Sequence, residues 1–424
     1  MDPEVSASAQ VADRAILRVV AAVAAAFVLF GFAIDSPGAI VRGLVAIVTS
    51  RDTLLTDYFG VGGVGASFVN AGLLTLCACL VYHLAGAKMT GAAVACLFLV
   101  LGFALFGKNL LNIWFIVAGV YLYSRFKGEA FAANINTAFF GVALAPIFSE
   151  ILFSTTLPLS ASLPLGVVTA LAIGFVLSPV AAQVFKAHMG FSLYNMGFAA
   201  GLVGTVVVAL YKAHGFVADP VFIWTSGNNV VLGAFLCALF LALIAAGFWF
   251  DRDLLAGLRR IVGMSGQSPS DFIAEAGFGA ALANMGLCGL LGVAYVLLVG
   301  GDLNGPVVGA IFTIVGFAAF GKHPRNVVPV MLGVFLGTLG TSWQASTPSF
   351  LLAALFGTTL APIAGRFGWH WGIVAGVLHG AAAQTVGPLH AGLNLYNNGF
   401  AAGIVATILV PIIVAVRART GQGT

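Results

Sequence analysis

Fourteen apolar runs follow one another along this chain, and the short connections between them leave almost no residues for a water-facing domain. Sixty per cent of the residues are hydrophobic and 8% are charged, whereas a soluble globular protein carries roughly 25% charged residues. A run of about 20 apolar residues crosses a bilayer as a helix. The pattern therefore predicts an all-α membrane protein and argues against nucleic-acid-binding, secreted and cytosolic classes.

The runs and their flanking charges predict an orientation. Residues 38–49 and 252–264 mix apolar residues with arginine and predict short helices lying in the membrane interface. If the N-terminus is cytoplasmic, most flanking Lys and Arg residues fall inside, as the positive-inside rule requires. We therefore expect a multi-pass protein of a bacterial inner (plasma) membrane, surrounded by lipid bilayer, with both termini cytoplasmic. The runs cover residues 16–34, 63–83, 89–106, 110–124, 132–153, 163–185, 191–211, 222–250, 275–300, 304–320, 326–342, 348–365, 369–388 and 391–416.

The second half of the sequence repeats the first. The stretch His188–Gly201 reads HMGFSLYNMGFAAG and His390–Gly403 reads HAGLNLYNNGFAAG, identical at ten of fourteen positions. GFALFGKNLLN (102–112) likewise matches GFAAFGKHPRN (316–326), and FGVALAPI (140–147) matches FGTTLAPI (356–363). We expect two membrane repeats, residues 1–215 and 216–424, with seven segments each.

An odd number of segments makes the second repeat enter the membrane from the opposite side. Such inverted repeats are typical of transporters, with the substrate site near the bilayer midplane between the repeats. The offset between matched residues falls from 216 to 202, so the first half carries 14 extra residues. TTLPLSASLPLG (155–166) is the predicted insertion, expected as an outer loop.

Two lysines stand out among the matched residues. Lys108 and Lys322 each follow a Phe-Gly pair between two short apolar runs. In one interpretation both flanking runs span the membrane and each lysine extends to the interface. In the other the runs form re-entrant hairpins, possible only where the backbone lines protein or water, and the lysines then serve function at membrane depth.

The matched His-Tyr-Asn segments are the second group of candidates. Polar side chains that recur where packing needs only apolar ones predict a substrate site for a small polar, or anionic, solute. The alternative interpretation is structural, as hydrogen-bonded histidines and as asparagines that join helices. Glu150 and Arg366 occupy matching positions and are expected at the interface. The candidate substrate-binding residues are His188, Tyr194, Asn195, His390, Tyr396, Asn397, Asn70, Asn284, Lys108 and Lys322.

No catalytic motif, cofactor motif or metal-ligand spacing occurs in the sequence. We therefore expect a protein that is not an enzyme and that has no catalytic residues, no metal and no cofactor. The five cysteines lie in apolar runs and are interpreted as packing residues.

The FGK-x-x-x-N and H-x-G-x-x-L-Y-N-x-G-F-A-A-G motifs resemble those of an uncharacterised family of bacterial polytopic membrane proteins, a domain of unknown function. This resemblance covers nearly the whole chain and implies a membrane fold without an assigned activity. FVNAGLL (68–74) and LYNNGFAAGI (395–404) are also similar, more distantly, to asparagine-containing motifs of urea transporters. That similarity implies inverted repeats and a channel-like path for a small solute.

Together these features predict a transporter or channel for a small polar solute, with its site between the two repeats. An ion-coupled secondary transporter and a non-transport membrane protein, such as a sensor or an assembly partner, are the alternatives. The expected partners are the bilayer and the solute, with no nucleic acid. Many such channels are homo-oligomers, which is a further expectation.

Overall fold

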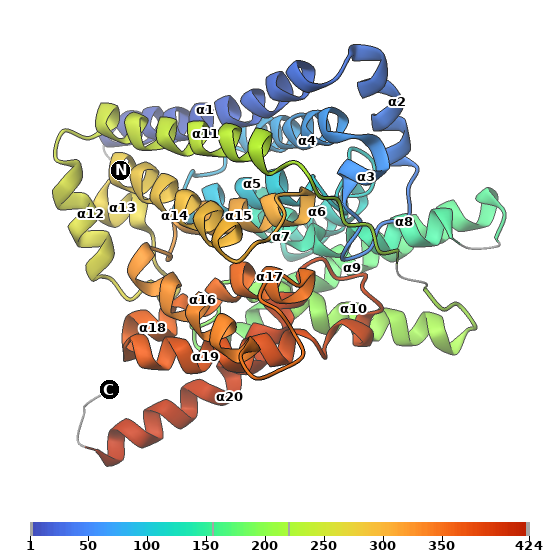
Figure 1. Ribbon diagram of the computed structural model, residues 1–424. Coiled ribbons are helices and arrows are strands. Elements are labelled where there is room, and N and C mark those ends of the chain that lie inside the picture. Colours follow the sequence, from blue (N-terminus) through green and yellow to red (C-terminus); the bar gives the residue numbers. More distant parts are fainter. Residues whose placement is uncertain (1–2, 155–156, 219–220, 421–424) are drawn as a thin grey trace.

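The computed structural model describes residues 3–154, 157–218 and 221–420, and helices joined by short connections make up almost all of this part (Figure 1). Apart from two isolated bridges, these residues form no β-structure. The predicted all-α class is confirmed. The first half contains α1 (Pro3–Ile34), α2 (Pro37–Val48), α3 (Tyr58–Gly62), α4 (Val64–Leu84), α5 (Gly91–Phe103), α6 (Trp114–Lys127), α7 (Phe131–Gly141), η1 (Val142–Leu144), α8 (Ala145–Phe153), α9 (Leu159–His188) and α10 (Asn195–Ala213).

The second half gives the same succession of elements, apart from the additional 3-10 turn η3 before α20. Both α4 and α14 have 21 residues, α5 and α15 have 13, and α3 and α13 have five. The packing also recurs, because α1 packs on α4 as α11 packs on α14, and α6 packs on α9 as α16 packs on α19. The elements are α11 (Asn229–Phe250), α12 (Leu254–Gly263), α13 (Phe272–Ala276), α14 (Phe278–Leu298), α15 (Gly305–Phe317), α16 (Pro324–Thr338), α17 (Pro348–Gly357), η2 (Thr358–Leu360), α18 (Ala361–Phe367), α19 (Trp369–Ala383), η3 (Gly387–His390) and α20 (Asn397–Arg419).

Nine stretches of the described residues are long and apolar enough to cross a membrane: α1 from Ala12, α4, α7–α8, α9, α10, α11, α14, α17–α18 and α20. The helices α5 and α15 are too short, because 13 residues rise about 20 Å where the hydrocarbon core is about 30 Å thick. Every residue of α15 is buried, and so is nearly every residue of α5. These two helices therefore form the centre of the molecule, where they pack on each other.

Several predicted segments are broken where the sequence suggested one run. Residues 132–153 and 348–365 each contain a 3-10 turn, η1 or η2, between two α-helices. Residues 191–194 and 391–396 belonged to predicted spans, but α10 and α20 begin only at Asn195 and Asn397. The predicted short helices at 38–49 and 252–264 are confirmed as α2 and α12.

The predicted outer loop at 155–166 is mostly helical. Thr155 and Thr156 lie outside the described residues, but α9 already begins at Leu159 and continues through Pro164. Pro164 and Pro179 both lie inside this helix, where a proline has no N–H group to donate to the preceding turn. The extra residues of the first half therefore lengthen α9 to 30 residues, against 15 in α19.

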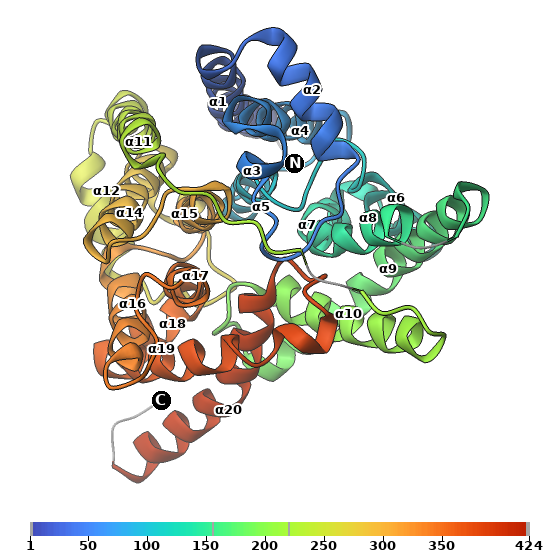
Figure 2. The ribbon, with the colours of Figure 1, turned by 45° about the vertical axis from the view of Figure 1, so that its right-hand side comes forward.

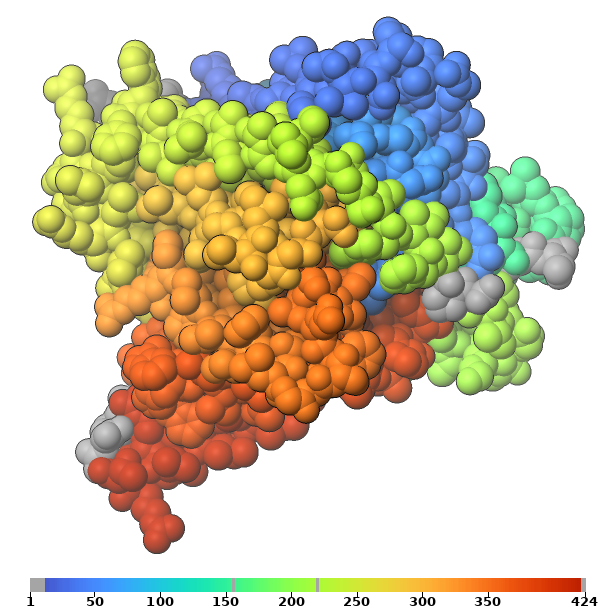
Figure 3. All heavy atoms as spheres, in the orientation of Figure 1, coloured from blue at the N-terminus to red at the C-terminus, as the bar shows by residue number. Residues whose placement is uncertain are grey.

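Figure 2 shows how the halves meet. The elements α1–α9 occupy the top and right of this view and α11–α19 the left, while α10 lies beside α20 below them. In Figure 1 the start of α1 and the end of α20 lie on the left side, and Figure 3 shows that α20 projects beyond its neighbours. The most extensive contacts between the halves are those of α5 with α15 and of α10 with α20.

Candidate functional site

Two buried asparagines hold the chain where α5 and α15 end. Asn70 Nδ2 donates to the carbonyls of Ala104 and Lys108 at 2.7 and 3.0 Å, and Asn284 Nδ2 makes the matching bonds after α15 at 2.8 and 2.7 Å. A helix end leaves carbonyls without partners inside the helix, so each amide fixes the same turn. The Oδ1 atom of each asparagine is buried and has no hydrogen-bond partner among the described residues.

The two turns carry the matched lysines into the protein interior. Lys108 and Lys322 are both 0% exposed, so neither extends out of the protein toward lipid headgroups. Lys108 Nζ donates to the hydroxyl of Tyr396 at 2.6 Å, and Lys322 Nζ donates to the hydroxyl of Tyr194. Each lysine therefore bonds to a tyrosine of the other half. Lys322 Nζ also donates to Thr358 Oγ1 at 2.8 Å.

Aromatic rings surround both ammonium groups. Lys108 Nζ lies 4.9 Å from the ring centre of Phe103 and 4.7 Å from that of Tyr396. Lys322 Nζ lies 4.4 Å from Tyr194 and 5.3 Å from Phe317. Ring faces offer only partial negative charge. Among the described residues, neither lysine has a carboxylate within 4.0 Å, so no acidic side chain there would neutralise an ammonium group directly.

The extended segments before α10 and α20 complete the crossing of the halves. The amide of Leu193 donates to the carbonyl of Thr359 at 3.1 Å, and the amide of Leu395 donates to that of Ala143 at 3.0 Å. Each extended segment thus binds at the 3-10 turn of the other half. The two helices then cross where a Cβ atom on Gly197 would lie 2.8 Å from the Cα atom of Gly399. Only glycines allow this approach.

A cavity of about 260 Å³ lies where these elements meet. Its walls include Phe103 and Phe317, Tyr194 and Tyr396, and Gly197 and Gly399, so matched residues of both halves contribute. The volume is slightly below the ~300 Å³ at which drug-sized pockets begin. The cavity therefore suits a small solute, and two of its lining residues, Tyr194 and Tyr396, are the tyrosines to which the lysines donate.

The structure brings some predicted site residues together and leaves others apart. Tyr194, Asn195 and Tyr396 line the cavity, and Lys108 and Lys322 contact its tyrosines. His188, His390, Asn397, Asn70 and Asn284 do not line it.

Both histidines instead make short-range bonds within their own segments. His188 Nε2 bonds Asn195 Oδ1 at 2.9 Å, and His390 Nε2 bonds Asn397 Oδ1 at 3.0 Å. The Nδ2 atoms of the asparagines donate to the carbonyls of Ala181 and Ala383, both at 3.1 Å. These bonds join the start of α10 to α9 and the start of α20 to α19.

Sequence reasoning missed the aromatic residues and Thr358. Phe103 and Phe317 are matched in the repeat, which is the signal that could have singled them out.

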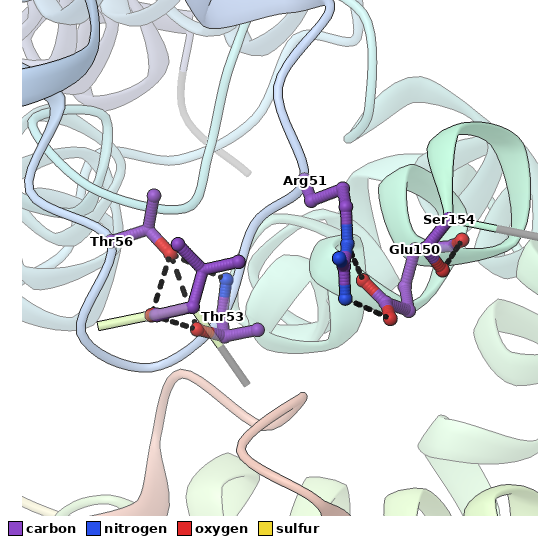
Figure 4. A network of polar contacts seen from close by, with 6 residues as sticks. Arg51, Thr53, Thr56, Glu150 and Ser154 are labelled. Atoms are coloured by element: carbon purple, nitrogen blue, oxygen red, sulfur yellow. Dashed lines mark hydrogen bonds and ion pairs between the residues drawn. The ribbon is translucent and has the colours of Figure 1, made fainter. Parts of the chain in front are cut away.

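The sequence also predicted that Glu150 lies at the membrane interface. In the structure Glu150 is 1% exposed and is bonded to Arg51 (Figure 4). The guanidinium makes two bonds to this carboxylate, Nη2 to Oε1 at 3.1 Å and Nε to Oε2 at 3.3 Å. Burial near an arginine in another segment is not readable from sequence spacing.

Comparison with curated proteins gives no match, and comparison with solved structures gives none either. A family model described as "Protein of unknown function (DUF1576)" matches residues 36–213 and 250–415. These two regions contain both lysines, both tyrosines and every other predicted site residue. Since they cover more than half of the sequence, the chain belongs to this family of proteins of unknown function.

Proposed function

We propose that this protein is a membrane transporter or channel, not an enzyme, and that it moves a small anionic solute through the cavity between its two halves. The observation that carries the proposal is the crossed pair of buried lysine–tyrosine contacts at this cavity. A buried ammonium group is unfavourable unless a negative partner compensates it. A solute carboxylate or similar anion is such a partner.

The backbone around the cavity supports transport. Non-helical backbone at membrane depth is tolerated where it lines a cavity or protein, and transporter sites are built in this way from broken helices. Here the turns after α5 and α15, the 3-10 turns η1 and η2, and the extended segments before α10 and α20 all converge.

The arrangement of the halves supports an inverted repeat with both termini cytoplasmic. In Figure 1 α2 lies at the right side of the molecule, whereas its counterpart α12 lies at the left, with the start of α1 and the end of α20. Arg259 and Arg260 on α12 and Arg417 and Arg419 on α20 then share one side. By the positive-inside rule this is the cytoplasmic side of a bacterial inner membrane.

Solute flux into proteoliposomes tests the proposal. Purified protein is reconstituted and offered radiolabelled lactate, succinate, glycerol or urea, with empty liposomes as the reference. We expect the anions, and not the neutral solutes, to enter faster than into empty liposomes. Lys108→Met should reduce that flux by about tenfold or more, since a charged hydrogen bond contributes about 1.5–3 kcal/mol.

The matched control is Lys186→Met, because Lys186 is an exposed lysine in the last turn of α9. It should leave flux unchanged. Equal flux in the Lys108 and Lys186 variants, or no anion flux above that of empty liposomes, contradicts the proposal.

A further inference from the structure

A buried carboxylate outside the cavity is present in one half only. Asp52, in the connection between α2 and α3, is 0% exposed. Its Oδ1 atom accepts bonds from Tyr58 OH at 2.7 Å and Ser50 Oγ at 3.2 Å. Its Oδ2 atom accepts from Ser149 Oγ at 2.7 Å, Asn112 Nδ2 at 3.0 Å and Asn109 Nδ2 at 3.3 Å. Five neutral donors therefore surround this carboxyl group.

The second half folds the same corner without an acid. Asp52 lies five residues before Asp57, which caps α3, and the residue five before the matching cap Asp271 is Gly266. Asn326, the counterpart of Asn112, donates to the carbonyl of Ser265 at 3.4 Å. A backbone carbonyl thus closes the loop there, so the fold does not require a carboxylate at this place.

Two hydroxyl donors of the cluster are also lost in the second half, although Asn112 is retained there as Asn326. Tyr58 corresponds to Phe272, and Ser149, two residues after Ile147, corresponds to Gly365, two after Ile363. A duplication that retains its helices and its lysine–tyrosine pairs but keeps this polar set in one copy indicates a task that one copy performs.

The donor set selects a proton over a metal cation. A cation needs oxygen acceptors directed at it, whereas two amide NH2 groups point at Asp52. The orientation of these side chains is fixed by their oxygens. Asn112 Oδ1 accepts from the backbone N–H of Asn109, and Asn109 Oδ1 accepts from the backbone N–H of Asn112, both at 3.0 Å. A proton can still be accommodated, since the hydroxyls of Tyr58 and Ser149 can turn from donors to acceptors.

We propose that Asp52 is the proton-binding site that couples proton movement to solute transport, which rests on the transport function proposed above. The proton adds to a carboxylate oxygen and leaves from it again, and no other bond is made or broken. A proton would have a short path from the surface to Asp52. The next residue, Thr53, lines a surface hollow of about 490 Å³ together with Leu54 and Val221.

Protonation acts on the solute site through the turn after α5. Asn112 Nδ2 shares its two hydrogens among Asp52, Ser149 and the carbonyl of Gly107, the residue before Lys108. A neutral carboxyl group accepts weaker bonds than a carboxylate, so proton binding loosens the segment that holds Lys108. The titratable or charged groups around this corner are Tyr58 on α3 and the Arg51–Glu150 pair, while Lys108 follows the Gly107 carbonyl that Asn112 bonds.

Burial raises the pKa of Asp52 from 3.8 to about 7, although its hydrogen bonds lower it. The folded protein then binds a proton that the unfolded chain releases, between about pH 4 and pH 7. Stability falls with rising pH where the folded state binds more protons than the unfolded state. Between about pH 4 and pH 7 the ratio of folded to unfolded protein should therefore decline, by at most about tenfold per pH unit. Above pH 7 the contribution is constant.

Infrared titration of the purified protein, without any solute, tests the inference. The C=O band of a protonated carboxyl group should disappear from the wild-type spectrum as pH rises through about 7. Asp52→Asn should lack this band and lose the stability decline between pH 4 and 7. Asp35→Asn is the control and should retain both, because Asp35 has a counterpart in Asp251 and bonds the amide of Gly65 at 2.8 Å.

If Asp52→Asn does not fold, Ser149→Ala keeps the measurement decisive. It leaves the carboxyl group in place but removes a donor, so the midpoint of the band should move to higher pH. A wild-type spectrum in which no such band disappears between pH 5 and 9, a band unchanged in Asp52→Asn, or an unmoved midpoint in Ser149→Ala overturns the proposal. None of these results depends on solute flux, so the proposed transport function fails or stands separately.

Discussion

At the scale of residues, the two buried lysines are matched in sequence but not in their surroundings. Lys322 donates to Tyr194 and to Thr358, whereas Lys108 donates to Tyr396, and the position matching Thr358 is Val142. An ammonium group has three donors, so Lys108 keeps more donor capacity for a solute. We infer that Lys108 makes the stronger contact with an anion.

Removing the two tyrosine hydroxyls should therefore have unequal effects. Tyr396→Phe leaves Lys108 without the hydroxyl, and losing a partner of a buried polar group costs about 1–3 kcal/mol. Tyr194→Phe should cost less, because Lys322 keeps Thr358. Thermal unfolding in detergent measures both, and adding Val142→Thr to Tyr396→Phe should recover part of the loss. Equal losses in the two single variants would contradict this inequality.

The sequence predicted the lysines and tyrosines as site residues, but not that each pair joins opposite halves. A match between two motifs does not tell which residues are close in space, so the sequence was equally consistent with a contact between Lys108 and Tyr194. Phe103 and Phe317 escaped notice because the chain has 35 phenylalanines, and nothing local marks two of them. Asp52 escaped because repeat matching favours residues present in both halves, and this one is present in one.

At the scale of elements, apolar runs predicted where helices lie but not where they break. The residues of η1 and η2 are buried, and hydropathy does not distinguish a buried 3-10 turn from a buried helix. The prolines Pro146 and Pro362 follow these turns at the start of α8 and α18, where proline is favoured. Matched prolines after matched glycines were thus the available signal for the breaks.

Glycine contacts fix the helix pairs, and one pair gives a direct test. A Cβ atom on Gly376 of α19 would lie 2.2 Å from the carbonyl oxygen of Val330 and 2.9 Å from Gly333 Cα. Gly376→Ala should therefore destabilise the α16–α19 pair by about 1–3 kcal/mol, the usual range for overpacking.

Gly174→Ala should act similarly on α6 and α9, where the matching Cβ position lies 2.1 Å from the carbonyl oxygen of Ile116. Gly263→Ala is the control, because nothing lies within 4 Å of that position. Midpoints of thermal unfolding compare the three variants. If the unfolding midpoint of Gly376→Ala equals that of Gly263→Ala, the close α16–α19 contact does not stabilise the protein and the prediction is wrong.

At the scale of the whole molecule, two copies of one sequence pattern exchange their contacts. Asp57 caps α3 and bonds the amide of Gly305 at the start of α15, while Asp271 caps α13 and bonds that of Gly91 at the start of α5, both at 3.1 Å. The lysine–tyrosine pairs repeat this crossing. Neither half has a complete cavity alone. The duplication, which can be read directly from the sequence, therefore forms the candidate site by joining two incomplete copies.

The proposed inverted arrangement predicts that matched residues of the two copies face opposite sides of the membrane. Arg42 on α2 and Arg259 on α12 are exposed residues of corresponding amphipathic helices, which lie at opposite sides of the molecule in Figure 1. In intact cells, a membrane-impermeant maleimide should label Arg42→Cys, whereas Arg259→Cys should react only after permeabilisation. The unaltered chain, whose cysteines lie in apolar segments, gives the background. Because two non-inverted repeats would place both helices on one side, labelling of both cysteines from the same side excludes the inverted arrangement, and with it the symmetric solute path between the halves.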